Sequence, residues 1–134
     1  MALTAKEMAS QLSILSSDLF QAIKAEELFN QAWTKSDKAK TSPQALAFIN
    51  HSNAISNWLI RTILSFERLE KRVEALKKVV QMAEECASLN NFDTMVAVMA
   101  ALDNAATSRL RSAWKVVRKG FYCTVFFLIT ILGN

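Results

Sequence analysis

Glycine, proline, histidine and cysteine are all scarce in this sequence. Its 134 residues include two Gly, one Pro, one His and two Cys. So little Gly and Pro leaves scant material for tight hairpins or for a glycine-rich loop that cradles phosphate. A single imidazole argues against a metal site, and two cysteines without paired spacing fit a reducing compartment. We therefore expect neither a metal nor a cofactor.

The residues that are abundant favour helices. Hydrophobic residues make up 51% of the chain and charged residues 21%, which excludes a disordered or collagen-like chain. Ala, Leu, Lys, Glu and Met are good helix formers, and the length suits one domain rather than a two-domain enzyme. These features predict an all-α fold, an orthogonal domain of about six helices.

Capping and apolar patterns locate these helices. Thr4 and Glu7 have the spacing of a capping box. Asp93 is the expected N-cap of the fifth helix, and Thr107 or Ser108 that of the last. The expected helical segments are 4–23, 25–33, 44–65 (one helix or a broken pair), 67–89, 93–102 and a last one after 107 or 108, with a solvated loop over 34–43. The expected inward faces are Met8, Leu12, Leu15, Leu19 and Ile23 in the first helix, Leu69, Val73, Leu76, Val80, Ala83 and Ala87 in the fourth, and Leu110, Trp114 and Val117 in the last.

The segment 44–65 contains an unusual polar run. Residues 50–53 are Asn-His-Ser-Asn, and Ser56 and Asn57 follow. Short polar side chains compete for backbone hydrogen bonds and lower the helix propensity. We therefore expect this run to have a role outside helix formation.

Conventional enzyme chemistry is hard to build from these residues. His51 is the one imidazole, and a partly exposed, hydrogen-bonded side chain is its favoured interpretation. Cys86 could pair with it as a nucleophile, but its place beside an apolar stripe favours a small buried thiol. Glu84 and Glu85 are adjacent and point in different directions, so they do not form a paired-carboxylate site.

The net charge of +4 is concentrated near the C-terminus. Five basic residues carry +5 in a stretch without an acid, which leaves −1 for the rest of the chain. Such a stretch attracts phosphates of nucleic acid or lipid, or is simply a solvated helix face; without an aromatic platform for bases, nucleic acid is not an expected partner. The five residues are Arg109, Arg111, Lys115, Arg118 and Lys119.

Residues 120–134 are apolar and carry no charge. About a dozen such residues are too few for a membrane span, which needs ~20. The first residues also lack the apolar region of a secretory signal. We expect a cytoplasmic protein, with recruitment to the membrane through the basic stretch and the tail as an alternative.

Several distinctive sequence blocks follow one another over residues 4–116. Residues 4–33 contain an A-x-Q-L-S core and a following L-F-x-x-I, and residues 49–64 read I-N-H-S-N-A-I-S-N-W-L-I-R-T-I-L. E-R-L-E-K-R-V at 67–73, L-N-N-F-D-T at 89–94 and R-L at 109–110 with Trp114 come after them. In order and spacing these blocks resemble the catalytic domain of the Ras-type guanine nucleotide exchange factors (RasGEF), and they look Son-of-sevenless-like.

The resemblance implies a partner, a Ras-like small GTPase in its GDP-bound or nucleotide-free form. It implies release of GDP by binding of the switch regions, with no covalent chemistry. Ile49 and Val96 would line an apolar pocket for an aromatic anchor of switch 2, and Asn50 and Asn53 would supply hydrogen bonds. Asp103, in place of the usual Asn, and Ala105, in place of a small hydroxyl residue, would weaken further contacts; the six expected GTPase-binding residues are Ile49, Asn50, Asn53, Val96, Asp103 and Ala105.

The resemblance also implies that family domains continue beyond the position of Trp114, with a helical hairpin that opens switch 1. We therefore expect residues 1–119 to form a partial RasGEF domain, residues 120–134 to form a divergent tail, and exchange activity to be impaired. The alternatives are a GTPase-binding module without exchange activity and a peripheral membrane protein.

Overall fold

The computed structural model describes residues 3–119, and every regular element within this range is helical. The elements are α1 (Ala5–Gln21), α2 (Ala25–Leu28), the 3₁₀ helix η1 (Phe29–Thr34), α3 (Lys38–Thr41), α4 (Pro43–Ser65), α5 (Leu69–Ser88), α6 (Phe92–Asp103) and α7 (Ala105–Ser108). Residues 111–119 are also helical. The all-α expectation is confirmed, and the short elements explain why there are more helices than the six expected.

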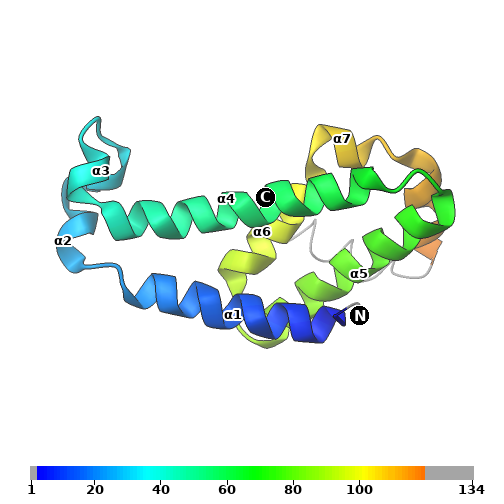
Figure 1. Ribbon diagram of the computed structural model, residues 1–134, viewed down its shortest axis with the longest axis horizontal. Helices are drawn as coiled ribbons and strands as arrows, with labels where there is room; N and C mark the ends of the chain where they lie inside the picture. The colour runs from blue at the N-terminus through cyan, green and yellow to red at the C-terminus, as the bar shows by residue number, and fades with distance from the viewer. Residues whose placement is uncertain (1–2, 120–134) are drawn as a thin grey trace.

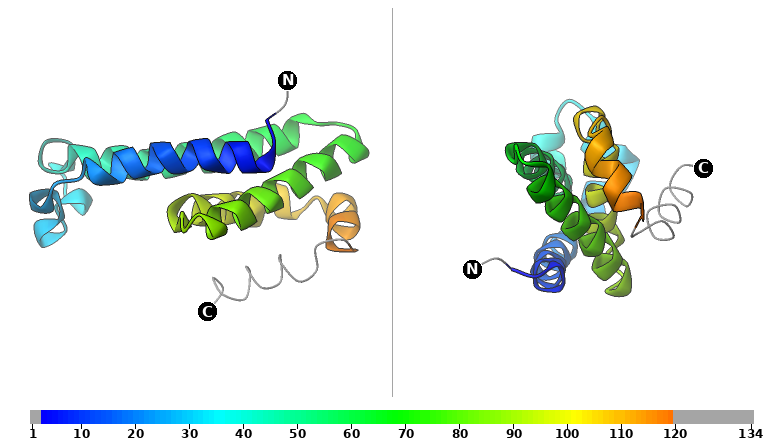
Figure 2. Two further views of the ribbon diagram at one scale, coloured as in Figure 1. Left: turned by 90° about the horizontal axis from the view of Figure 1, so that it is seen from below. Right: turned by 90° about the vertical axis from the view of Figure 1, so that its right-hand side faces the viewer.

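Helices α1 and α4 run in opposite directions along the molecule (Figure 1). Helix α6 packs against α4, and α5 packs against both α1 and α6. Figure 2 shows α6 on one side of the α1–α4 pair, with the 111–119 helix at the end of the molecule far from α2 and α3. No helix within residues 3–119 is both long and apolar enough to span a bilayer.

Helix α5 supplies much of the core. Val73, Leu76, Val80 and Ala83 are buried as the apolar spacing predicts, whereas Leu69, the first residue of the helix, is exposed. The expected inward face of the last helix is also confirmed, with Trp114 and Val117 buried and Leu110 packed against the core.

Helix α1 begins as predicted, and most of its expected stripe faces inward: Met8 and Leu12 pack against the core, and Leu19 and Ile23 are partly buried. The backbone N–H of Thr4 donates to Glu7 Oε2 (2.7 Å), and that of Glu7 donates to Thr4 Oγ1 (3.2 Å), which completes the capping box. The pKa of the Glu7 carboxyl is lowered by the hydrogen bonds that it accepts from the Thr4 backbone N–H and from the Thr4 hydroxyl. The expected stripe is wrong at Leu15, which is half exposed; the fully buried side chains of α1 are the small residues Ala5, Ala9 and Ser16. Small side chains let α5 approach α1 closely, and this approach decides which face is inside.

The segment expected to form one helix over 25–33 breaks after Leu28. Asn30 and Gln31 have left-handed backbone angles, with φ of 52° and 54°. The break lets the chain turn back toward the start of α4, where the buried Glu27 accepts hydrogen bonds from the backbone N–H groups of Gln44 (2.6 Å) and Ala45 (3.2 Å). A carboxylate here satisfies backbone donors that a helix start leaves unpaired. Within the expected loop 34–43, residues 38–41 form α3.

Two of the expected helix caps are wrong. Asn91, not Asp93, caps α6, because its side-chain oxygen accepts from the Thr94 N–H (3.1 Å). The last helix begins at residue 111, so neither Thr107 nor Ser108 caps it. Both lie in α7, which Asn104 caps by accepting from the Ala106 N–H (3.0 Å). Helix α4 is continuous over its 23 residues, which resolves the alternative of a broken pair.

Candidate functional site

Two hydrogen bonds connect α4 directly to α6. Ser52 Oγ donates to Asp93 Oδ1 (2.6 Å), and Ser56 Oγ donates to the backbone carbonyl of Ala97 (2.7 Å). The two donors are four residues apart on α4, and the two acceptors are four residues apart on α6. The helices therefore run in the same direction here and match each other over about one turn.

The two bonds place four other side chains beside the line of contact. Ile49, Ser52, Asn53 and Ser56 have the spacing i, i+3, i+4, i+7 and share one face of α4. Val96 and Ala100 share a face of α6 with the two acceptors by the same spacing. Ile49 is 39% exposed and Val96 48% exposed, and Asn53 and Ala100 are also exposed. We call these four residues, Ile49, Asn53, Val96 and Ala100, the α4–α6 face; Figure 1 shows α6 beside α4.

The remaining expected site residues lie at the margins of this face. Asn50 is exposed on the neighbouring side of α4. Asp103, the last residue of α6, is exposed roughly 10 Å along the helix axis from Val96. Ala105 is exposed at the start of α7, which contacts both α4 and α6. Ile49, Asn53 and Val96 are thus exposed on adjoining helices beside the contact of α4 with α6, and Asp103 and Ala105 extend the face toward α7.

The residues that build this contact were missed from the sequence. Ser52 and Ser56 belong to the unusual polar run, and Asp93 was interpreted as a cap. A pair of serines four residues apart within one helix, together with an acid in the first turn of another helix, is the signal that could have indicated a polar contact between them.

Asp93 also connects α6 to α1. Its second carboxylate oxygen accepts from Ser16 Oγ (3.4 Å), and Ser16 lies 3.1 Å from the hydroxyl of Thr94. Asn91 Nδ2 donates to Ser13 Oγ (3.0 Å), which lies about one turn before Ser16 in α1. The first turn of α6 is therefore held by polar contacts from two different helices.

The candidate nucleophile has the properties of a structural residue. Cys86 is fully buried, and burial, aided by the charge of Glu85, raises the pKa of its thiol to about 11. It therefore stays protonated near neutral pH. His51 is partly buried, and its Nε2 is enclosed without a hydrogen-bond partner. Within residues 3–119, no three His, Cys, Asp or Glu side chains gather as metal ligands would.

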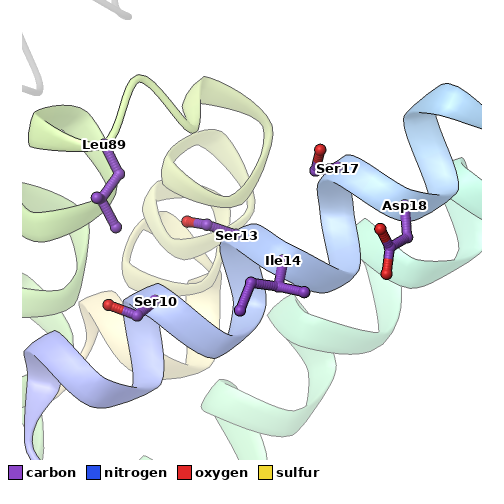
Figure 3. Close-up of a pocket in the computed structure, with 6 residues that line it drawn as sticks. All are labelled: Ser10, Ser13, Ile14, Ser17, Asp18 and Leu89. Carbon is purple, nitrogen blue, oxygen red and sulfur yellow. The ribbon is translucent and has the colours of Figure 1, made fainter.

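A shallow, open pocket lies between α1 and the end of α5. Figure 3 shows its lining, which comes from one face of α1 and from the residue that follows α5. The lining residues are Ser10, Ser13, Ile14, Ser17, Asp18 and Leu89. Asp18 is the one charged residue among these six, so the pocket offers no acid–base pair and no nucleophile with a neighbouring base.

The basic stretch forms an outward surface. All five of its basic side chains are exposed, and the 111–119 helix is fixed to the core through Ala113, Trp114 and Val117. The indole Nε1 of Trp114 donates to the backbone carbonyl of Thr107 (3.0 Å). The charges therefore project from a helix whose opposite side is anchored.

Comparison of the sequence with known protein families identifies the family to which this chain belongs. A family model described as RasGEF domain matches residues 7–126. The chain belongs to the RasGEF family. The "Ras guanine nucleotide exchange factor M" of Dictyostelium discoideum is 39% identical over 111 residues, which is 82% of this chain. The "Ras-specific guanine nucleotide-releasing factor RalGPS1" of Danio rerio is 34% identical over 116 residues, or 87% of this chain.

The RasGEF resemblance inferred from the sequence blocks is thus confirmed, and a Son-of-sevenless subtype stays a prediction. The matched segments make up 12% of the Dictyostelium protein and 20% of the zebrafish protein. The chain therefore spans between about a tenth and a fifth of the length of these relatives. The division at residue 119 also stays a prediction, because residues 120–134 lie outside the described residues.

Proposed function

We propose that this chain binds a Ras-like small GTPase through the α4–α6 face and, as part of an exchange factor, promotes release of GDP. The observation that carries the proposal is the grouping of Ile49, Asn53 and Val96 on adjoining helices, with their side chains exposed. Exposed apolar side chains beside amides are typical of surfaces that a partner covers. Relatives that are named as Ras exchange factors support the choice of partner.

The proposed mechanism uses binding energy rather than bond chemistry. A protein that binds the nucleotide-free GTPase more tightly than the GDP-bound form lowers the affinity for GDP by the same factor. No nucleophile or general base is needed for this effect. The protonated, buried thiol of Cys86 is consistent with a regulator of this kind.

Each side chain has a proposed role in capture. Ile49 and Val96 receive an apolar or aromatic anchor from the switch 2 region, since buried anchors of this type dominate interface energies. Asn50 and Asn53 donate and accept hydrogen bonds beside it. Asp103 and Ala105 add weaker contacts at the end near α7. An ionised carboxylate can only accept hydrogen bonds, and the methyl group of alanine can neither donate nor accept them.

The test is binding to a panel of Ras, Rap and Ral proteins, measured with and without bound GDP. Replacement of Ile49 or Val96 by Asp is expected to abolish capture, because each introduces a charge at the centre of the interface. Capture of a GTPase by both variants with unchanged affinity would contradict the proposal. Release of a fluorescent GDP analogue, measured in parallel, tests the impaired exchange activity that we expect of the 134-residue chain, and robust acceleration would refute that expectation.

A binding module without exchange activity is the alternative that uses the same face. In that case the chain associates with the GTPase while the rate of nucleotide release stays at its intrinsic value. The two readouts of the panel experiment, association and release, separate this alternative from an exchange factor.

The exposed basic side chains favour a second, weaker contact with anionic membrane surfaces. A basic residue near such a surface contributes about 1 kcal/mol, so five of them give measurable binding that falls with salt. Co-sedimentation with vesicles that contain phosphatidylserine tests this contact. We expect binding to be lost on neutral vesicles; binding to neutral vesicles that disappears on deletion of residues 121–134 would instead assign the contact to the tail.

A further inference from the structure

Two serines of the polar run in α4 have a use that helix formation does not explain. Ser52 and Ser56 face α6 and donate to Asp93 and to the Ala97 carbonyl at 2.6 and 2.7 Å. Other hydroxyls of the same helix bond within it: Thr62 Oγ1 donates to the Trp58 carbonyl (2.8 Å) and Ser65 Oγ to the Thr62 carbonyl (2.7 Å). The two serines are thus distinguished by partners on another helix.

We propose that Ser52 and Ser56, with Asp93, lock the register of α4 against α6 and so hold Ile49, Asn53 and Val96 on one side of the helix pair for capture of the GTPase. They are positioning residues that act through the α4–α6 face. This inference rests on the proposed function, and it assigns to the polar run the role that the sequence analysis left open.

The geometry explains why two bonds are needed. One bond between helices leaves rotation about that point free, whereas two bonds one turn apart fix both the rotation and the translation along the axis. A slip by one residue turns a helix by 100°, which would carry Ile49 away from this side of the helix pair. Apolar packing is non-directional and distinguishes such registers poorly, but short hydrogen bonds are directional.

Asp93 is itself held in place. Its other oxygen accepts from Ser16 of α1, and an acid in the first turn of α6 is favoured by the helix dipole. The other acceptor, the Ala97 carbonyl, belongs to the backbone of α6. The two acceptors on α6 are therefore fixed in place. Removal of the two donor hydroxyls on α4 is the most direct way to test whether they hold the register of the two helices.

The decisive comparison uses two double variants of α4. Ser52→Ala/Ser56→Ala removes both bonds to α6, and Thr62→Ala/Ser65→Ala removes two hydroxyls whose bonds stay within α4. We expect at least a tenfold loss of affinity for the GTPase in the first variant and less than a twofold change in the second. Ser52→Thr/Ser56→Thr keeps both hydroxyls and is expected to recover most of the affinity. If the two serines acted through packing alone, the threonine variant would show no such recovery relative to the alanine variant.

A second readout measures the register without any GTPase. Spin labels at Asn57→Cys and Ala100→Cys, in a Cys123→Ser background, report the distance between exposed sites on α4 and α6. We expect one narrow distance distribution in the parent and in the Thr62→Ala/Ser65→Ala variant. In Ser52→Ala/Ser56→Ala the distribution should broaden or shift on the scale of a helical turn, about 5 Å.

The outcomes separate this inference from the proposed function. If Val96→Asp abolishes capture while Ser52→Ala/Ser56→Ala binds within twofold of the parent, the register lock is overturned and the proposed function stands. If Val96→Asp leaves capture unchanged, the proposed function is overturned, and an unchanged label distance then overturns the register lock separately. If the double alanine variant fails to fold, Ser52→Ala alone is measured against Thr62→Ala by the same criteria.

Discussion

Helix α6 meets α5 and α4 in two different ways. The α5 side of the core is apolar and closed, with Leu76, Met82 and Cys86 fully buried. Helix α4 also contributes Leu59 and Ile63 to the core, but the N-terminal part of its contact with α6 is joined by serine hydroxyls and leaves Ile49 and Val96 exposed to solvent. The closed contact is of the kind that supplies folding stability, and the open contact leaves apolar surface for a partner. Substitutions on the two sides should therefore separate stability from binding.

The largest effect is expected at the closed contact. Leu76→Ala removes a fully buried side chain from α5 and should lower the free energy of unfolding by about 2–5 kcal/mol, because a cavity is left in the core. Urea denaturation followed by circular dichroism measures the loss. Where the variant is folded, its affinity for the GTPase should stay near that of the parent. A loss below about 1 kcal/mol would show that α5 is not the stabilising contact.

The polar contact of Glu27 with the start of α4 makes stability depend on pH, which sharpens the comparison. The backbone N–H of Lys24 above all, with those of Gln44 and Ala45, lowers the pKa of Glu27 below its usual range. Because the pKa of this carboxyl is lower in the folded state, its stabilising contribution is fully present above the unfolded pKa. The contribution is lost as the pH falls through the folded pKa.

Glu27→Gln should therefore reduce stability at neutral pH by less than Leu76→Ala, and flatten the acid limb of the stability curve. The exposed neighbour Glu26 provides the control, Glu26→Gln. Thermal denaturation over the acid to neutral range measures both variants. An unaltered acid limb in Glu27→Gln would contradict the assignment of this carboxylate as the cap of α4.

The smallest perturbation of the protein is expected from a chemical test of the closed contact, the reaction of the Cys86 thiol with a disulfide reagent. With its thiol pKa raised to about 11, Cys86 should have roughly two hundred times less thiolate at pH 8 than an ordinary cysteine. In a Cys123→Ser variant, reaction with a disulfide reagent should be slower than in denaturant by at least this factor. The rate should keep rising with pH beyond pH 9. Rapid modification at pH 8 in the folded chain would contradict a closed contact.

The apolar periodicity predicted the closed contact because burial there follows the helical repeat. Val73, Leu76, Val80 and Ala83 follow each other at intervals of three and four residues, and all four are inside. The same reasoning failed for Leu15, because α1 is approached through small residues whose burial carries no hydropathy signal. Packing between helices, not the pattern of one helix, determined the inward face.

The open contact could be predicted only in part. The family resemblance indicated Ile49, Asn53 and Val96 as one surface; the structure leaves all three exposed beside the contact of α4 with α6, and their role in binding stays a prediction. Ser52, Ser56 and Asp93 were missed because a serine that bonds to another helix looks, in sequence, like a serine that faces water. Glu27 was missed for the same reason, since its partners are backbone groups 17 and 18 residues away along the chain.

Two exposed valines offer the most direct test of GTPase binding at the α4–α6 face. Val96 is 48% exposed on α6, and Val116 is 44% exposed on the 111–119 helix among the basic side chains. The affinity for nucleotide-free Ras-family proteins is measured for Val96→Asp and Val116→Asp, with unfolding midpoints as the check on folding. We expect Val96→Asp to lose binding and Val116→Asp to keep it within about threefold, less than 1 kcal/mol. Equal binding by both variants, or loss in both at unchanged stability, would contradict a GTPase site at this face.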